Sequence, residues 1–189
     1  KVDTAFSRFR LGDETGYRDF LLAQAAGFLP IEQALDEGGA AGILPDWPAR
    51  RRGDLLRADL ADLNVTLPEP FFAPDFISVK ASMLGAIYVL EGSRLGGAVL
   101  KRTVPGHFPR RFLEARQAAG SWRTLLQALD EFLIRPGDLD AAGRVGRGAR
   151  HRRLLRTIRR SGKAGAHDHC RHRHCNPQCV HNMAVALVG

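Results

Sequence analysis

The composition of the chain changes abruptly near residue 140, and this change limits how much of it can fold as one body. All aromatic residues lie at or before Phe132, and none follows in the last 57 positions. Residues 1–140 carry 17 Lys and Arg against 19 Asp and Glu, a charge of −2, whereas residues 141–189 carry 11 against 1, a charge of +10. Because the net charge of +8 comes from the tail, it does not indicate a nucleic-acid or acidic-membrane partner for the rest.

These features divide the chain into a body, residues 1–140, and a basic His- and Cys-rich tail, residues 141–189. The body is long enough for one domain, and it contains no cysteine that could form a disulfide. No apolar run approaches the roughly 20 residues of a membrane helix, and the first residues do not resemble a signal peptide, which predicts a soluble cytoplasmic protein. The chain starts at Lys1 without an initiator Met and in a helix-like pattern, so we expect a truncated N-terminus.

Apolar residues at helical spacing predict an all-α body. The first complete helix is expected from Asp13, which can cap it, to about Glu37. Pro30 inside this pattern should bend the helix or split it. Another helix is expected to start at Asp46-Trp47-Pro48, and the proline-rich residues 64–75 should form a connection.

The longest helical pattern spans residues 75–103, and it is apolar over so much of its surface that it should lie in the middle of a bundle. Shorter helices are expected at 108–119 and 121–134, and no segment shows a convincing strand alternation. Seven residues on the apolar helix faces are expected to be mainly buried: Phe20, Phe28, Met83, Ile87, Trp122, Leu126 and Phe132.

The segment Leu90-Glu91-Gly92-Ser93-Arg94-Leu95-Gly96-Gly97 places three glycines within six positions of this long helix. Each glycine in a helix costs roughly 1 kcal/mol relative to alanine, so their presence needs a reason. Two reasons are open. Gly92 and Gly96 share one face and would permit tight packing against another helix, or the helix bends there and its exposed backbone lets a flat ligand lie against it.

The string Tyr88-Val89-Leu90-Glu91-Gly92-Ser93-Arg94-Leu95-Gly96-Gly97 resembles the distal-helix segment of heme oxygenases, especially the bacterial ones found beside bacteriophytochromes. The resemblance spans roughly residues 1–140, and it implies a heme oxygenase-like helical bundle with a kinked, Gly-rich distal helix. Other stretches are similar to the same family: Val2 to Phe6 through Tyr17 to Leu21, Trp47 to Arg50, and Leu56 to Leu60.

The resemblance implies that heme lies between a proximal helix, which supplies a neutral His to the iron, and the Gly-rich distal helix. Heme is then both cofactor and substrate, and O2 with an external electron donor, a reductase or ferredoxin, converts it to biliverdin, CO and iron. A bacteriophytochrome is a candidate recipient of the biliverdin. By motif match, Gly92, Gly96 and Gly97 would allow heme to approach the backbone closely. Ser93 stands where many relatives carry a carboxylate that orders the distal water, and it is the predicted catalytic residue; no metal ligand is assigned.

Two parts of the family pattern have no counterpart in this sequence. The proximal His would fall just before Lys1, and none of the seven His residues replaces it by motif, since His107 follows a Pro-Gly turn and the others lie at 151 or later. The C-terminal helix, which in the family contacts the heme propionates, should begin near residues 138–140, where Arg, Gly and Ala take over. Activity is therefore expected to require a His upstream of Lys1. The alternative is a non-catalytic helical heme-binding or interaction module on the same scaffold.

Three interpretations of the tail remain open. Residues 167–179 contain enough His and Cys to bind zinc, although their spacing matches no common zinc finger. Residues 144–160 are basic enough to bind nucleic acid, but no aromatic residue is interleaved to stack on bases. Residues 159–179 lack every large apolar residue, which is typical of a disordered tail or of out-of-frame translation from a GC-rich gene.

Overall fold

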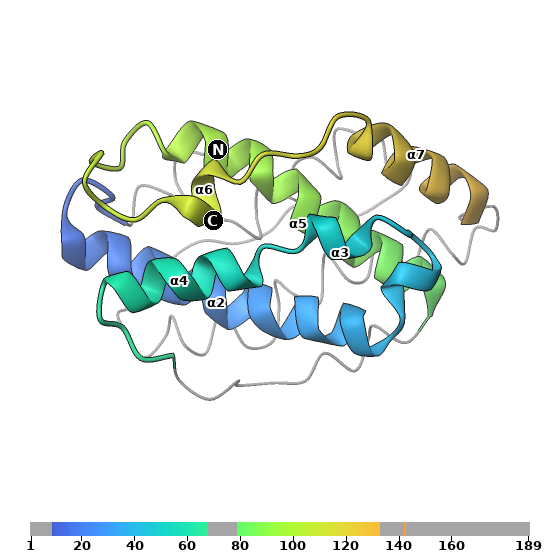
Figure 1. Cartoon of the computed structure of the whole chain (residues 1–189), viewed down its shortest axis with the longest axis horizontal. Helices are drawn as coiled ribbons and strands as arrows, with labels where there is room; N and C mark the ends of the chain where they lie inside the picture. The colour runs from blue at the N-terminus through green and yellow to red at the C-terminus, as the bar shows by residue number, and fades with distance from the viewer. Residues whose placement is uncertain (1–8, 68–78, 133–141, 143–189) are drawn as a thin grey trace, which may run out of the picture.

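The computed structural model describes residues 9–67, 79–132 and 142. All the regular structure in these residues is helical, which confirms the all-α prediction (Figure 1). The elements are the α-helices α2 (Glu14–Glu37), α3 (Trp47–Arg50), α4 (Gly53–Asp62), α5 (Lys80–Leu100), α6 (Arg111–Glu114) and α7 (Ser121–Phe132), and the 3-10 helix η1 (Ala40–Gly42).

The first helix begins and ends for local chemical reasons. The Asp13 side chain accepts a hydrogen bond from the Gly16 N–H at 2.8 Å, so Asp13 is the predicted N-cap of α2. After the last helical residue, Gly39 has a φ of 76°, a conformation that glycine adopts without strain. The helix continues through Pro30, so it is not split there, and the alternative that Pro30 bends it stays a prediction.

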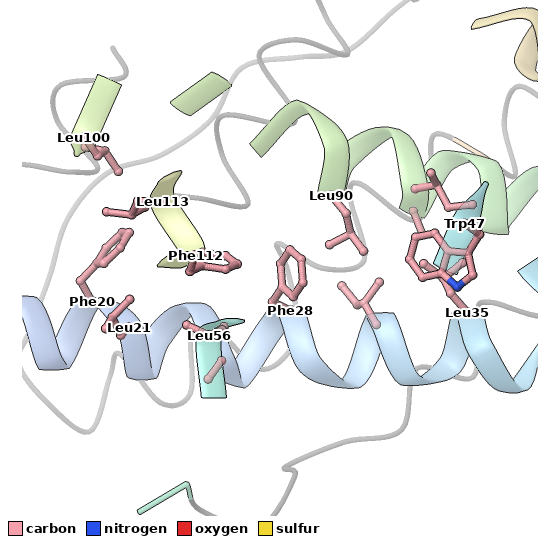
Figure 2. Packing of buried hydrophobic residues seen from close by; sticks show 14 of the residues in the cluster. Phe20, Leu21, Phe28, Leu35, Trp47, Leu56, Leu90, Leu100, Phe112 and Leu113 are labelled. Carbon is pink, nitrogen blue, oxygen red and sulfur yellow. The ribbon is translucent and has the colours of Figure 1, made fainter. Parts of the chain in front are cut away.

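Two long helices form the frame of the body. Figure 1 shows α2 and α5 extending along its length, and α4 lies beside α2 while α6 and α7 pack on α5. Figure 2 shows the side chains of Phe20 and Phe28 on α2 directed toward α6, with Phe20 near Leu113 and Phe28 beside Phe112. The central position of α5 was predicted from its apolar surface, and it is confirmed.

Most of the predicted core is buried. Phe20, Phe28, Met83 and Ile87 are buried, and Trp122 and Phe132 are partly buried and pack against the core. Leu126 is 40% exposed, so its predicted burial is wrong. The buried side of α7 consists of Ser121, Leu125 and Ala128. Because successive helix residues point about 100° apart, Leu126 is turned away from the side that Leu125 buries.

Two predicted helices are shorter than expected. The helix predicted over 108–119 is a single turn, Arg111–Glu114, because Pro109 precedes it and Ala115 leaves the helical region with φ −57° and ψ 112°. The helix predicted over 75–103 is described from Lys80 to Leu100, and residues 75–78 lie outside the described part. The Gly-rich segment is helical throughout, and its predicted bend stays a prediction.

By length and composition alone, helix α5 is long and apolar enough to cross a membrane, with a mean hydropathy of 1.2. This corrects the expectation that no apolar run of the chain approaches the length of a membrane helix. In this structure 67% of the most apolar 18-residue stretch of α5 is buried inside the protein, as in the core helix of a bundle. Near its start, a Cβ on Gly85 would collide with the main chain of Ala142. Most of the tail, including its cysteines, lies outside the described residues.

Candidate functional site

The C-terminal half of α5 presents a surface without large polar side chains. Gly92 and Gly96 are four residues apart, so they lie on the same side of the helix. Leu95 and Val99 lie on that side as well, and they are 56% and 64% exposed. We call Gly92, Leu95, Gly96 and Val99 the glycine face. Gly92 is buried and Gly96 is half-buried, so the exposed part of this face consists of the side chains of Leu95 and Val99 beside the backbone of Gly96. An apolar surface of this kind suits an apolar ligand, and the close approach of a ligand to the backbone of Gly92 stays a prediction.

Gly97 lies on a different side of the helix from the glycine face. A Cβ at this position would lie 3.4 Å from Leu113 Cδ2 and 3.7 Å from Leu113 Cα. Gly97 is therefore placed where α5 packs on α6. Helix packing thus accounts for one of the three glycines, whereas the glycine face contains the other two.

Helix α6 has only one turn, and a buried carboxylate on α4 fixes its position. Asp59 is buried, and its side chain accepts hydrogen bonds from the Phe112 N–H at 2.9 Å and the Arg111 N–H at 3.1 Å. Burial raises the pKa of the Asp59 carboxyl, and these backbone hydrogen bonds oppose the shift. The contact keeps Phe112 and Leu113 against the core.

Ser93, the predicted catalytic residue, is buried and already hydrogen-bonded. Its hydroxyl donates to the Leu90 carbonyl at 2.6 Å and accepts from Arg52 Nη2 at 2.5 Å. The side chain lies about 100° around the helix from Gly92, so it is directed toward the bundle rather than along the glycine face. One lone pair of its oxygen remains to accept a further hydrogen bond.

Arg52, which precedes α4, lies directly behind the glycine segment. Its guanidinium carbon lies 4.8 Å from the ring centres of both Phe28 and Phe112, and Nη2 donates to the Leu90 carbonyl at 2.7 Å. Among the described residues its Nε–H has no hydrogen-bond partner. Burial, and then the nearby Arg94, lower the pKa of Arg52 to about 9, so the group is still a cation at neutral pH.

A buried carboxylate, Glu91, lies at the centre of a second polar cluster beside the glycine segment. It accepts from Arg94 Nε at 3.0 Å, from Arg50 Nη1 at 3.4 Å and from Gln117 Nε2 at 2.5 Å. Arg50 also donates to the Ser121 carbonyl at 2.6 Å. These contacts connect α5 to α3 and to the start of α7, so they restrain the helix close to Gly92.

Glu32 of α2 holds the chain that carries Arg52. Its two carboxylate oxygens accept from the N–H groups of Arg52 at 2.7 Å and Gly53 at 2.8 Å. A Cβ on Gly53 would collide with this carboxylate, which explains glycine at the first position of α4. Burial raises the pKa of Glu32, and the two backbone hydrogen bonds partly oppose that shift.

Sequence reasoning missed the charged residues of these clusters as functional residues: Arg50, Arg52, Arg94, Glu32 and Glu91. One signal was available, because Glu91 is the only acidic residue in a largely apolar helix and a buried charge needs a partner. The identity of its partners was not accessible, since Arg50 is 41 residues away along the chain.

The described residues contain one histidine and no assembled metal site. His107 lies in an exposed loop, with its ring centre 4.6 Å from that of Phe108. Within the ranges 9–67 and 79–132, no group of three or more His, Cys, Asp or Glu is arranged to hold a metal ion. The proposed zinc ligands of the tail lie outside these ranges.

Two curated proteins are similar to this chain. The heme oxygenase of Xanthomonas campestris pv. campestris (strain 8004) is 33% identical over 114 residues, which cover 57% of this chain and 66% of that protein, just under two thirds of its length. Heme oxygenase PigA of Pseudomonas aeruginosa is 31% identical over 144 residues, which cover 67% of this chain and 72% of that protein. This chain belongs to the heme oxygenase family.

Membership in the heme oxygenase family confirms the resemblance inferred from the Gly-rich string, and it implies heme as a ligand. The helical structure is consistent with a heme oxygenase-like fold. No protein-family model matches the chain, and no solved structure matches it at a significant level. The roles assigned to Gly92, Gly96, Gly97 and Ser93 stay predictions.

Proposed function

We propose that this protein binds heme against the glycine face and cleaves it oxidatively to biliverdin, CO and iron. Heme is oxidised, O2 is reduced, and an external donor supplies the electrons. The observation that carries this proposal is the coincidence of two facts: the chain belongs to the heme oxygenase family, and its most Gly-rich helix has two exposed apolar side chains, Leu95 and Val99, beside the half-buried Gly96.

The glycine face has the properties that a flat macrocycle requires. Gly92 and Gly96 allow the plane of a ligand to approach the helix backbone more closely than any residue with a side chain would. Leu95 and Val99, 56% and 64% exposed, gain from removal of their apolar surface from water. When bound, heme supplies the iron and the porphyrin on which the redox chemistry occurs. The protein supplies position, exclusion of water and hydrogen bonds.

Ser93 has a narrower role in this proposal than a carboxylate would have. Its proton is donated to the Leu90 carbonyl, and Arg52 already donates to its oxygen. The hydroxyl is buried and directed toward the bundle, so in this proposal Ser93 acts through the Leu90 carbonyl and Arg52 rather than by contact with heme. It carries no charge that would attract a proton.

The remaining parts of the proposal rest on the family resemblance. A reductase or ferredoxin would deliver electrons, a bacteriophytochrome would receive the biliverdin, and the reaction would take place in the cytoplasm. The described residues assign no axial histidine to the iron, since the single histidine among them, His107, is in an exposed loop.

The test is heme turnover by the full chain with imidazole added as the axial ligand. Hemin, a chemical reductant, O2 and catalase are combined, where catalase removes free peroxide that would degrade heme without the enzyme. We expect biliverdin with imidazole and none without it. Tight hemin binding without biliverdin would support the non-catalytic heme-binding module instead, and absence of specific binding in the presence of imidazole would contradict both.

A further inference from the structure

Arg52 is an unusual residue to find in the core of a helical bundle. It is 2% exposed, and its side-chain hydrogen bonds in the described structure go to the Leu90 carbonyl and the Ser93 hydroxyl, not to a carboxylate. Burying a cation without a hydrogen-bonded carboxylate is unfavourable, and an apolar residue of similar length would fill the same space beside the two phenylalanine rings. Glu91 and Glu32 attract the charge from nearby, but the side-chain hydrogen bonds of Arg52 in the described structure all go to α5.

Both acceptors of Arg52 lie at the start of the glycine segment. The Leu90 carbonyl accepts from Arg52 Nη2 at 2.7 Å and from the Ser93 hydroxyl at 2.6 Å. In a regular helix the same carbonyl accepts the Arg94 N–H, so three donors compete for two lone pairs. A side chain that enters the helical hydrogen-bond ladder is a recognised cause of helix bending.

We propose that Arg52 is a positioning residue for heme. It draws the Leu90 carbonyl toward α4 and turns the Ser93 side chain inward, and it thereby sets the position of Gly92 and Gly96 relative to the bundle. The rings of Phe28 and Phe112 have their centres 5.2 Å apart and each lies 4.8 Å from the guanidinium carbon, so both contact the guanidinium from the same side. The consequence for heme rests on the proposed function, whereas the effect on α5 does not.

The experiment compares the full chain with Arg52→Met, which keeps the length and aromatic contacts but removes every donor. Tyr17→Phe is the matched control, because it removes one buried hydrogen bond, to the Pro109 carbonyl at 2.7 Å, with no contact to the glycine segment. Amide hydrogen exchange at Arg94 and hemin affinity with added imidazole are measured for each protein. If Arg52→Met does not fold, Ser93→Ala carries the same comparison, because it removes the other side-chain donor to the Leu90 carbonyl.

In Arg52→Met the Arg94 amide should exchange about threefold more slowly than in the parent, since a competitor for its acceptor is removed. A residue that only supports packing would give the opposite sign, with faster exchange throughout residues 90–97. Hemin affinity should fall about tenfold in Arg52→Met, the scale of one charge-assisted hydrogen bond, and less than twofold in Tyr17→Phe.

The outcomes separate this inference from the proposed function. If the parent chain binds hemin and Arg52→Met binds it equally well, the positioning role is overturned and the function stands. If the parent chain binds no hemin even with imidazole, the proposed heme function is overturned. Amide exchange at Arg94 then still shows whether Arg52 competes for the Leu90 carbonyl of α5. Faster exchange at Arg94 in Arg52→Met would contradict the proposed competition.

Discussion

Replacing Glu91 by leucine tests whether the buried cluster beside the glycine segment stabilises the fold. The side chains of Glu91 and Arg50 are 1% and 2% exposed, and that of Arg94 is 8% exposed. In Glu91→Leu both arginines lose this carboxylate while they stay in the core. Arg50 keeps Asp46, at 2.7 Å, whereas Arg94 keeps only main-chain carbonyls.

The expected loss in the free energy of unfolding follows from the contacts that the two arginines lose and keep. Removing one partner of a buried ion pair destabilises a protein by about 3–5 kcal/mol, because the other charge is left uncompensated. We expect about 3 kcal/mol, the lower end of that range, because Arg50 retains a second carboxylate. This is a large fraction of the about 5–15 kcal/mol by which a domain of this kind is usually stable.

The assay is urea unfolding of the full chain, followed by circular dichroism. With a slope of about 2 kcal/mol per molar urea, the midpoint should fall by about 1.5 M in Glu91→Leu. Glu91→Gln, which keeps the shape and removes the charge, should show a smaller decrease. Glu14→Gln is the surface control, since its pair with Arg18 is exposed and 3.7 Å long, and it should cost less than about 0.5 kcal/mol. A change in Glu91→Leu no larger than in this control would refute the assigned role.

Three further predictions concern packing and pH. Gly97→Ala should raise the free energy of unfolding by up to about 1 kcal/mol, because the new Cβ meets Leu113 at an ordinary contact distance of 3.4 Å; a loss measured by urea unfolding would contradict this. Leu125→Ala should lower it by about 2–5 kcal/mol and Leu126→Ala by far less, since these side chains are 0% and 40% exposed; equal losses would mean that the orientation of α7 is wrong. The folded pKa of Glu32 is raised, so the native state binds its proton more readily than the unfolded state, and this residue's contribution to stability falls as pH rises from the unfolded pKa through the folded one. Stability relative to Glu32→Gln should therefore improve as pH is lowered from 7 through that window, and a difference that does not change with pH would contradict the raised pKa.

The long helices were predictable because their sequence signals are local. Asp13 caps α2, and the apolar side chains of α2 recur at helical spacing as far as Leu35. The position of α6 was not predictable, because it depends on Asp59, which is 53 residues from Phe112 along the chain. The exposure of Leu126 likewise depends on which side of α7 meets α5.

For the candidate site, glycine spacing alone predicted a common face for Gly92 and Gly96, since it requires only the geometry of one helix. The same spacing could not show that Gly97 faces α6, because that contact depends on where Leu113 lies in the fold. Nor could it show that Arg52 reaches Ser93, 41 residues further along the chain. Residues whose function depends on distant partners need the tertiary structure.

Hemin titration of Gly96→Leu tests the central claim, that heme lies on the glycine face, most directly. The matched control is Gly27→Leu, because Gly27 is also inside a helix and a Cβ there meets nothing within 4 Å. Both variants and the parent are titrated with hemin in the presence of imidazole and followed by the Soret band, with helicity checked by circular dichroism. We predict that Gly96→Leu abolishes specific binding with its helicity largely unchanged, while Gly27→Leu binds like the parent. Unchanged hemin affinity in Gly96→Leu would contradict the account and would leave the glycines a role in helix packing alone.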